Sequence, residues 1–157
     1  MDFAEYVAAR RPALVRCAVL LGCPSPDAED LVQTTLTKAF RHWRRVSKAD
    51  QPDAYVHRML VNCLRDARAR RWGGELPTEH LPEPPAMNTD LADGFAVRRA
   101  LAAMSPQHRE VLVLRFYADL SERAVADALG LPAGTVKSRT SRALKALAAD
   151  ENIVRSI

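Results

Sequence analysis

The sequence predicts an all-α fold of two small helical domains joined by a linker. Apolar residues recur at helical spacing in both halves, and no segment shows the sustained two-residue alternation of a strand. Residues 73–85, rich in proline, glycine and acidic residues, contain four of the ten prolines. Because proline fixes φ and removes a donor, we expect an extended, solvated linker, with an ordered loop as the alternative. The predicted boundaries are 1–72, 73–90 for the linker, and 91–157.

The first domain reads as three helices, over residues 3–21, 27–44 and 53–72, with Asp27 as an N-cap and a loop over residues 46–52. In the second helix the apolar residues expected to face inward are Ala28, Leu31, Val32, Thr35, Leu36, Ala39, Phe40 and Trp43. In the third they are Tyr55, Val56, Met59, Leu60, Cys63, Leu64 and Ala67.

The second domain reads as four helices. Ser105 followed by Pro106 is a strong start signal, with serine as the N-cap and proline at the first helical position. Gly130 marks a tight turn between the last two helices. The expected helices cover residues 91–103, 106–116, 121–129 and 133–149, and the residues expected to seal the final corner are Leu129, Val136 and Leu144.

Composition excludes several classes of protein. The 157 residues are 48% hydrophobic and 27% charged, which fits a globular chain and not a disordered one. We find neither a run of apolar residues long enough to span a membrane nor a signal peptide, so we expect a cytoplasmic protein. The three cysteines form no C-x-x-C pair and the four histidines are scattered, so we expect no metal site, no cofactor and no disulfide.

The distribution of charge along the chain divides it at the same place as the proline-rich segment does. The net charge is +5 over residues 1–72, −5 over residues 73–97 and +4 over residues 98–157, for a formal total of +4. Two basic blocks joined by an acidic strip indicate two modules that can each face a polyanion.

The most specific local signal is a helix-turn-helix over residues 121–147. Its second helix carries four cations and, before Asp150, no acidic residue. Long cations suit phosphates and guanine, and small hydroxyls suit base edges. The alternative is that this helix simply exposes a basic face to solvent and binds no DNA. The candidate side chains are Lys137, Ser138, Arg139, Thr140, Ser141, Arg142 and Lys145.

Two further polar clusters lie in the first domain. Helix 53–72 carries arginines beside Tyr55 and Asn62, a set that suits backbone phosphates and an exposed base, although some of the arginines could simply solvate the helix end. The cations are Arg58, Arg65, Arg68, Arg70 and Arg71. The acids of helix 27–44 could suggest a hydrolase, but helix capping explains them and no histidine or lysine completes a catalytic site. We therefore expect no enzyme.

Two stretches of the sequence, one in each predicted domain, together resemble a known family. Residues 27–40, DAEDLVQTTLTKAF, look like region 2 of bacterial sigma factors, and residues 131–139, LPAGTVKSR, are similar to their region 4 helix-turn-helix. The order of the motifs and the short linker resemble the minimal extracytoplasmic-function (ECF) group of the sigma-70 family, and the composition leans toward an actinobacterial member.

The resemblance implies roles for particular residues. The −35 element would be read by Lys137, Ser138, Arg139, Ser141 and Arg142. The segment Val46, Ser47, Lys48, Ala49, Asp50 and Gln51 would capture a base of the −10 element, and adjoining DNA would be held by Tyr55, Arg58, Asn62 and Arg65. The β′ clamp helices of core RNA polymerase would dock on Asp30, Gln33, Thr34 and Thr37, and the β flap on the second domain.

The function implied is that of an alternative sigma factor, with core RNA polymerase and promoter DNA as partners. Many members of this group are held by an anti-sigma factor, so the resemblance adds one as a candidate partner. One rival interpretation is a stand-alone helix-turn-helix repressor or activator, which would bind duplex DNA without polymerase. Another is a sigma-like decoy that binds a regulator and never initiates transcription.

Overall fold

The computed structural model describes residues 2–71 and 91–150, and within them every regular element is a helix. This confirms the all-α prediction. The predicted linker and the tail after residue 150 lie outside the described residues. The elements are α1 (Phe3–Leu20), α2 (Ser25–Arg41), α3 (Trp43–Lys48), α4 (Pro52–Arg71), α5 (Leu91–Ala103), α6 (Pro106–Leu112), the π-helical turn η2 (Val113–Tyr117), α7 (Glu122–Leu129) and α8 (Ala133–Ala148).

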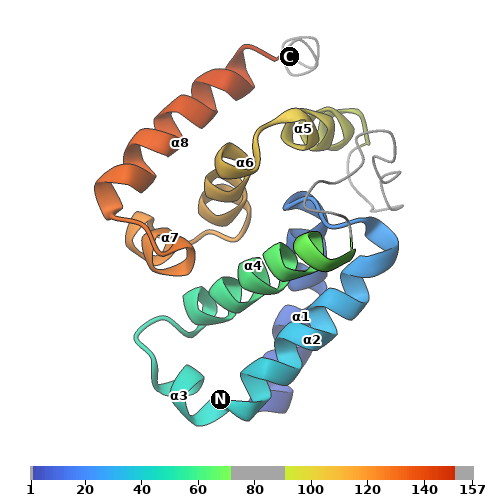
Figure 1. The fold of residues 1–157 in the computed structure, drawn as a ribbon, viewed down its shortest axis with the longest axis vertical. Coiled ribbons are helices and arrows are strands. Elements are labelled where there is room, and N and C mark those ends of the chain that lie inside the picture. Colours follow the sequence, from blue (N-terminus) through green and yellow to red (C-terminus); the bar gives the residue numbers. More distant parts are fainter. Residues whose placement is uncertain (1, 72–90, 151–157) are drawn as a thin grey trace.

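Helix α4 lies at the centre of the fold. It packs against α2 and α3 within the first half of the chain, and against α7 of the second half (Figure 1). Helix α1 packs against α2 and also contacts α5 and η2. The two helical halves therefore lie directly against each other along α4.

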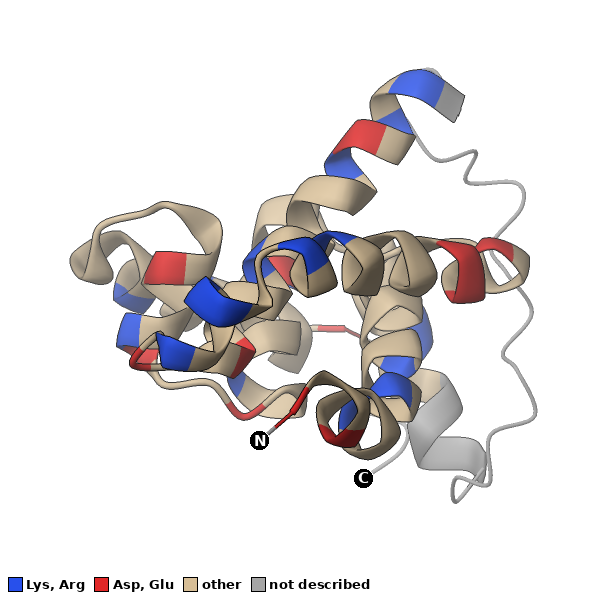
Figure 2. Cartoon of the chain, turned by 90° about the horizontal axis from the view of Figure 1, so that it is seen from below, with Lys and Arg blue, Asp and Glu red and all other residues tan. Residues whose placement is uncertain are grey.

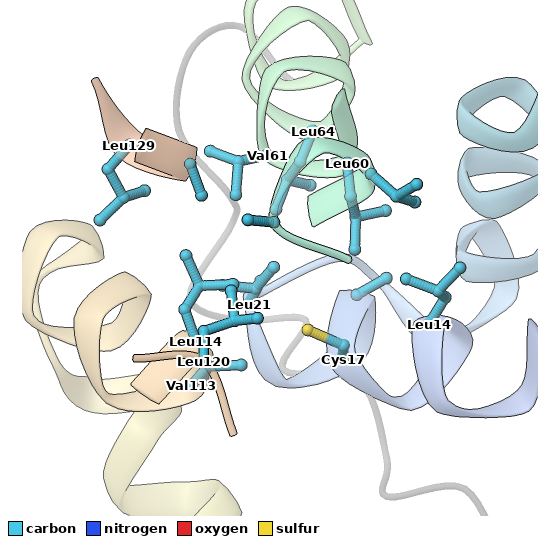
Figure 3. Packing of buried hydrophobic residues seen from close by; sticks show 14 of the residues in the cluster. Leu14, Cys17, Leu21, Leu60, Val61, Leu64, Val113, Leu114, Leu120 and Leu129 are labelled. Atoms are coloured by element: carbon cyan, nitrogen blue, oxygen red, sulfur yellow. The ribbon is translucent and has the colours of Figure 1, made fainter. Parts of the chain in front are cut away.

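Buried apolar side chains from both halves form one continuous core. In Figure 3, Leu60 of α4 lies toward Leu14 of α1, whereas Val61 lies toward Leu129 of α7. Val61 is 1% exposed, although helical spacing alone did not place it among the inward residues. The single inward face predicted for α4 is therefore too narrow, because this helix is covered on two sides.

The start of α2 differs from the prediction. The helix begins at Ser25, and Pro24 occupies the N-cap position without a side-chain capping bond. Pro26 is tolerated in the first turn because its missing N–H would have no helical partner there. Asp27 therefore lies inside the first turn, where its charge suits the helix dipole, and is not the N-cap.

Residues 46–48 and Pro52 are helical, so the prediction of a loop over residues 46–52 is wrong for these residues. Helix α3 follows α2 after His42, and Val46 in its middle is fully buried. Burying this valine under α4 favours a helical turn, since it brings an apolar side chain into the core. The connection between α3 and α4 is reduced to residues 49–51.

The capping signals of the second half are confirmed. The Ser105 hydroxyl accepts a hydrogen bond from the N–H of His108, and the Ser121 hydroxyl accepts one from the N–H of Ala124. Gly130 has φ +68°, in the left-handed region where a side chain is strained, and ends α7 as its C-cap.

No helix in the described part of the chain is both long and apolar enough to cross a lipid bilayer.

Gly130→Ala should lower the free energy of unfolding by about 1–2 kcal/mol, because alanine pays a steric cost in the left-handed region. Gly134, in the first turn of α8, is a matched control whose added Cβ also meets open space. Gly134→Ala should raise the free energy of unfolding by about 0.4–1 kcal/mol, since it restricts the unfolded chain. Urea unfolding of both variants checks the opposite signs, and equal effects would contradict the role given to φ.

Candidate nucleic-acid interface

The exposed side of α8 lies opposite the side that packs against the rest of the protein. Val136 and Ala143 are fully buried, and α8 packs on α6 and α7. The side chains predicted to read the −35 element face outward: Lys137, Ser138, Ser141 and Arg142 are exposed, and Arg139 is half-buried. Within the described residues, none of these three cations makes an ion pair. They are available to phosphates and bases.

Two hydroxyls on α8 are engaged with their own helix. Thr140 Oγ1 donates to the carbonyl oxygen of Val136 at 2.7 Å, and Ser138 Oγ donates to that of Thr135 at 3.1 Å. Their oxygens can still accept, so they suit donors on a base edge. The prediction that Leu144 seals the corner is wrong: it is 42% exposed, because Ala143 turns inward in its place.

The residues of α4 predicted to hold −10 DNA follow a stripe at helical spacing. Arg58, Asn62 and Arg65 are exposed, and Tyr55 is half-buried. Arg65 Nη2 lies 3.0 Å from Oε1 of Glu110, a residue of α6 that is 7% exposed. Arg58 Nη1 makes a long, 3.5 Å contact with the carbonyl oxygen of Asp127 in α7. In this arrangement the second half of the chain holds two of the predicted DNA-binding arginines.

The Arg68 guanidinium is hydrogen-bonded to another part of the chain. Its Nη2 donates to the carbonyl oxygen of Leu21, the C-cap of α1, at 3.2 Å. Burial lowers its pKa, and nearby Glu110 opposes that shift. A cation at a helix C-terminus is favoured by the helix dipole, so Arg68 ties α4 to α1.

The sequence analysis did not single out Arg109, whose side chain makes four hydrogen bonds at the junction between the two halves of the chain. It is 6% exposed, and it donates to the carbonyl oxygens of Leu101, Ala102 and Met104 in its own half and to that of Leu21 in the first half, at 2.9–3.3 Å. Burial and nearby Arg68 lower its pKa. Nothing in the local sequence signals this role, because all four acceptors are backbone atoms.

A polar network holds the start of α4 to α1. The Tyr6 hydroxyl donates to Asp53 Oδ1 at 3.0 Å, and Arg10 Nη2 lies 3.1 Å from Asp53 Oδ2. Burial raises the pKa of Tyr6, and the Asp53 charge reinforces this. His57 Nδ1 lies 2.6 Å from the carbonyl oxygen of Asp53, a geometry that suits an N–H donor. These contacts orient the end of α4 that carries Tyr55.

The segment predicted to capture a base is only partly accessible. Ser47, Lys48, Asp50 and Gln51 are exposed and Ala49 is half-buried, but the Val46 side chain is buried and cannot contact a base.

The face predicted for polymerase docking lies on the outer side of α2. Asp30, Gln33, Thr34 and Thr37 are all exposed, while Leu31, Val32, Thr35, Leu36 and Ala39 are buried beneath them. Phe40 was predicted to face inward, but it is 62% exposed. Phe3, Tyr6 and Trp43 fill that corner of the core, and the Phe40 ring lies on Phe3 with centroids 5.0 Å apart.

Charge is spread over both halves. Figure 2 shows basic residues on helices of each half, with acidic residues among them. Within residues 2–71 and 91–150, no group of histidine, cysteine, aspartate or glutamate has the spacing of a metal site. The three cysteines are buried thiols. Burial raises the pKa of Cys17 to about 12, so it carries no reactive thiolate near neutral pH.

Two family models match the chain: Sigma-70 region 2 over residues 6–73, and Sigma-70, region 4 over residues 94–147. The RNA polymerase sigma-E factor of Streptomyces coelicolor is 38% identical, over 94% of this chain and 84% of that protein. The ECF RNA polymerase sigma factor SigL of Mycobacterium tuberculosis is 33% identical, over 85% of this chain and 80% of that protein.

Two solved structures resemble the whole fold. The sigma factor RpoE of Bartonella quintana, in complex with the anti-sigma factor NepR, is 27% identical with a TM-score of 0.76, over 93% of this chain and 94% of that one. CnrH in complex with the cytosolic domain of CnrY is 28% identical with a TM-score of 0.65, over 94% of this chain and 85% of that one. Both matches extend over both halves of the chain.

His57 should make stability depend on pH. Burial lowers its pKa in the folded protein, whereas in the unfolded chain it titrates near about 6.5. As pH falls below about 6.5 the unfolded state takes up the proton first, so the free energy of unfolding should decrease. Urea unfolding at several pH values should show a weaker dependence for His57→Gln than for the wild type. The exposed control His42→Gln should keep the wild-type dependence; equal behaviour of both variants would exclude His57.

Proposed function

This chain belongs to the sigma-70 family of RNA polymerase sigma factors, and on that premise we propose that it is an alternative, ECF-type sigma factor. It binds core RNA polymerase and directs transcription from promoters that it recognises through −35 and −10 elements. The observation that carries this proposal is the presence of region 2 and region 4 in order on one chain. A stand-alone repressor has no need of the first of these regions.

We assign region 2 to residues 1–72, the linker to residues 73–90 and region 4 to residues 91–157. Region 4 reads the −35 element with α8, whose exposed cations have no ion-pair partner in the described part of the chain. Arg142 and Lys137 supply the long cationic contacts, and Ser138 and Ser141 the short polar ones. The left-handed turn at Gly130 sets the angle between α7 and α8.

Region 2 holds the −10 element along one edge of α4. The exposed residues between Ser47 and Gln51 take the flipped base, while Tyr55 offers a ring for stacking. Asn62 adds an amide beside the bases. Arg58 and Arg65 hold the backbone once they are released from region 4.

The core polymerase docks on the exposed stripe of α2. Asp30, Gln33, Thr34 and Thr37 present short polar groups to the β′ clamp helices, over a row of buried apolar residues that keeps the helix fixed. Region 4 contacts the β flap. The chain performs no chemistry of its own, because the polymerase supplies the catalytic site. We place the protein in the cytoplasm with the polymerase and its DNA.

An anti-sigma factor is a further partner that we propose. The two solved structures described above are both complexes, one with the anti-sigma factor NepR and one with the cytosolic domain of CnrY. Such a partner would bind the chain while its two halves lie together.

A core-dependence test decides the function. The purified chain is mixed with core RNA polymerase from an actinobacterium and with genomic DNA, and the run-off transcripts are sequenced. New start sites that share two spaced upstream elements are expected. Tight DNA binding by the chain alone, without new transcripts, would favour a repressor, and core binding without transcripts would favour a decoy.

Two substitutions should separate the two interfaces. Arg142→Ala should weaken −35 recognition by about 1–3 kcal/mol and spare core binding. Gln33→Ala should weaken core binding and spare the affinity of assembled holoenzyme for the promoter. Fluorescence anisotropy with labelled core and labelled promoter DNA measures both affinities. If Arg142→Ala weakened both equally, its −35 role would be wrong, and an unchanged core affinity of Gln33→Ala would remove Gln33 from the docking face.

A further inference from the structure

Helix α3 presents a group of cations to solvent. Arg44, Arg45 and Lys48 are exposed, and within the described residues none of them makes an ion pair. Arg41, at the end of α2, adds a fourth exposed cation. Asp50 is the one acidic residue between positions 41 and 51, so this stretch has a net charge of +3.

The hydroxyl of Ser47 lies on the same side of α3 as these cations. Val46 is fully buried and α3 packs against α4. Because successive helical residues are rotated by about 100°, residues 44, 45, 47 and 48 all lie opposite Val46. Ser47 is exposed, and its Oγ donates only a long hydrogen bond, of 3.3 Å, to the carbonyl oxygen of Arg44. A reagent from solvent can therefore reach this oxygen.

The sequence before Ser47 has a pattern that no interface described above explains. In the run Arg44-Arg45-Val46-Ser47, arginines stand two and three residues before a serine, and no other serine or threonine of the chain has arginines at both positions. Protein kinases select substrates by charge pattern, and an acidic cleft suits this one because carboxylates pair with guanidinium groups. The pattern indicates a substrate of a basophilic kinase, a kinase whose cleft binds basic segments.

Helix α3 is short enough to open into such a cleft. It has six residues, and a helix of this length is not stable by itself in water. Val46 is its one buried residue, and the C-cap Ala49 is already extended. Local opening of residues 44–48 therefore exposes a single buried side chain.

We propose that Ser47 is a phosphorylation site for a basophilic protein kinase, and that its phosphate occupies Arg44, Arg45 and Lys48 in place of promoter DNA. The effect on DNA rests on the proposed function, because it takes residues 47–51 as part of the −10 interface. In the transfer, Ser47 Oγ bonds to the γ-phosphorus of ATP, the bond from that phosphorus to the β–γ bridging oxygen breaks, and ADP leaves. The hydroxyl proton goes to the catalytic aspartate of the kinase.

A phosphate at this position removes most of the positive charge that α3 offers to DNA. It carries about −1.5 to −2 charges at pH 7, which reduces the net charge of residues 41–51 to about +1. The end of a helix disfavours an anion, but Arg44, one turn earlier, and the adjacent Lys48 offset this with charge-assisted hydrogen bonds. The neutralised cations no longer attract the −10 strand, and the phosphate repels its backbone.

A kinase reaction on the folded chain tests the modification site without polymerase or DNA. The probe is the catalytic subunit of cAMP-dependent protein kinase, a basophilic kinase, with Mg²⁺ and ATP. Proteolytic cleavage before Asp30 and Asp50 releases residues 30–49, in which fragmentation mass spectrometry should locate the phosphate on Ser47. Ser47→Ala should remove it. A phosphate found mainly on another residue would overturn the proposal.

Matched variants test recognition of the motif. Arg44→Gln and Arg45→Gln should each lower kcat/KM of the kinase for the chain about tenfold, the effect of losing one charged hydrogen bond. Lys38→Gln, which removes an exposed cation of α2 outside the motif, should leave kcat/KM unchanged. A synthetic peptide of residues 41–51 separates recognition from access. Phosphorylation of the peptide without the chain would show that α3 does not open, and absence of both would show that the motif is not recognised; either result overturns the proposal.

Promoter binding tests the effect of the phosphate. The chain phosphorylated at Ser47, made by incorporating phosphoserine during synthesis, is assembled with core polymerase on a promoter fragment whose −10 strand is single. At about 0.1 M salt its affinity should fall about fivefold if one phosphate contact is lost and about 25-fold if two are lost. The slope of log affinity against log salt should become shallower by about 0.7 per lost contact.

The chain phosphorylated at Ser25 is the matched control, since it adds the same charge to the same domain at the other end of α2. It should bind the promoter fragment as the unmodified chain does, and both phosphorylated chains should keep their affinity for core. Equal promoter affinities of the two phosphorylated holoenzymes would overturn the effect on DNA. If the unmodified chain gives no transcripts with core, the proposed function fails, and the kinase reaction alone decides whether Ser47 is a phosphorylation site.

Discussion

Burial of α4 on two sides is the constraint on which the rest of the structure depends. Leu60 points toward Leu14 and needs the first half of the chain, whereas Val61 lies next to it in sequence and points toward Leu129 of the second half. A helix with apolar residues on both sides cannot satisfy them with one partner. The second half must therefore lie against α4, and the core becomes continuous from α1 to α8.

The same helix also explains why its arginines divide into two groups. Those near the middle, Arg58 and Arg65, reach acceptors on the second half, and they are exposed enough to exchange them for solvent or another anion. Arg68, one turn farther along, points to the C-terminus of α1. Its guanidinium neutralises the end of a helix, as the buried Arg109 does from the other half. Arginines of one helix thus contact the second half at two positions and the end of α1 at a third.

Much of the local structure follows from the sequence because its causes are local. Ser105, Ser121 and Gly130 set helix ends through bonds or φ angles within a few residues, and each was recognised from its neighbours. The exposed sides of α2 and α8 follow from apolar periodicity, which is also a local property. The errors, Phe40, Leu144, Val46 and Asp27, concern positions where another element or a proline competes with that periodicity.

The sequence by itself determined the all-α class, the helix-turn-helix, the family, and which stretches carry the basic and polar side chains. The tertiary structure alone decided that Val61 and Leu64 face the other half, that Glu110 meets Arg65, and that Arg109 caps a helix far from it in sequence. The physical reason is that periodicity records which side of a helix avoids water. It contains no information about which distant side chain or carbonyl covers that side, because this depends on how all the helices pack at once.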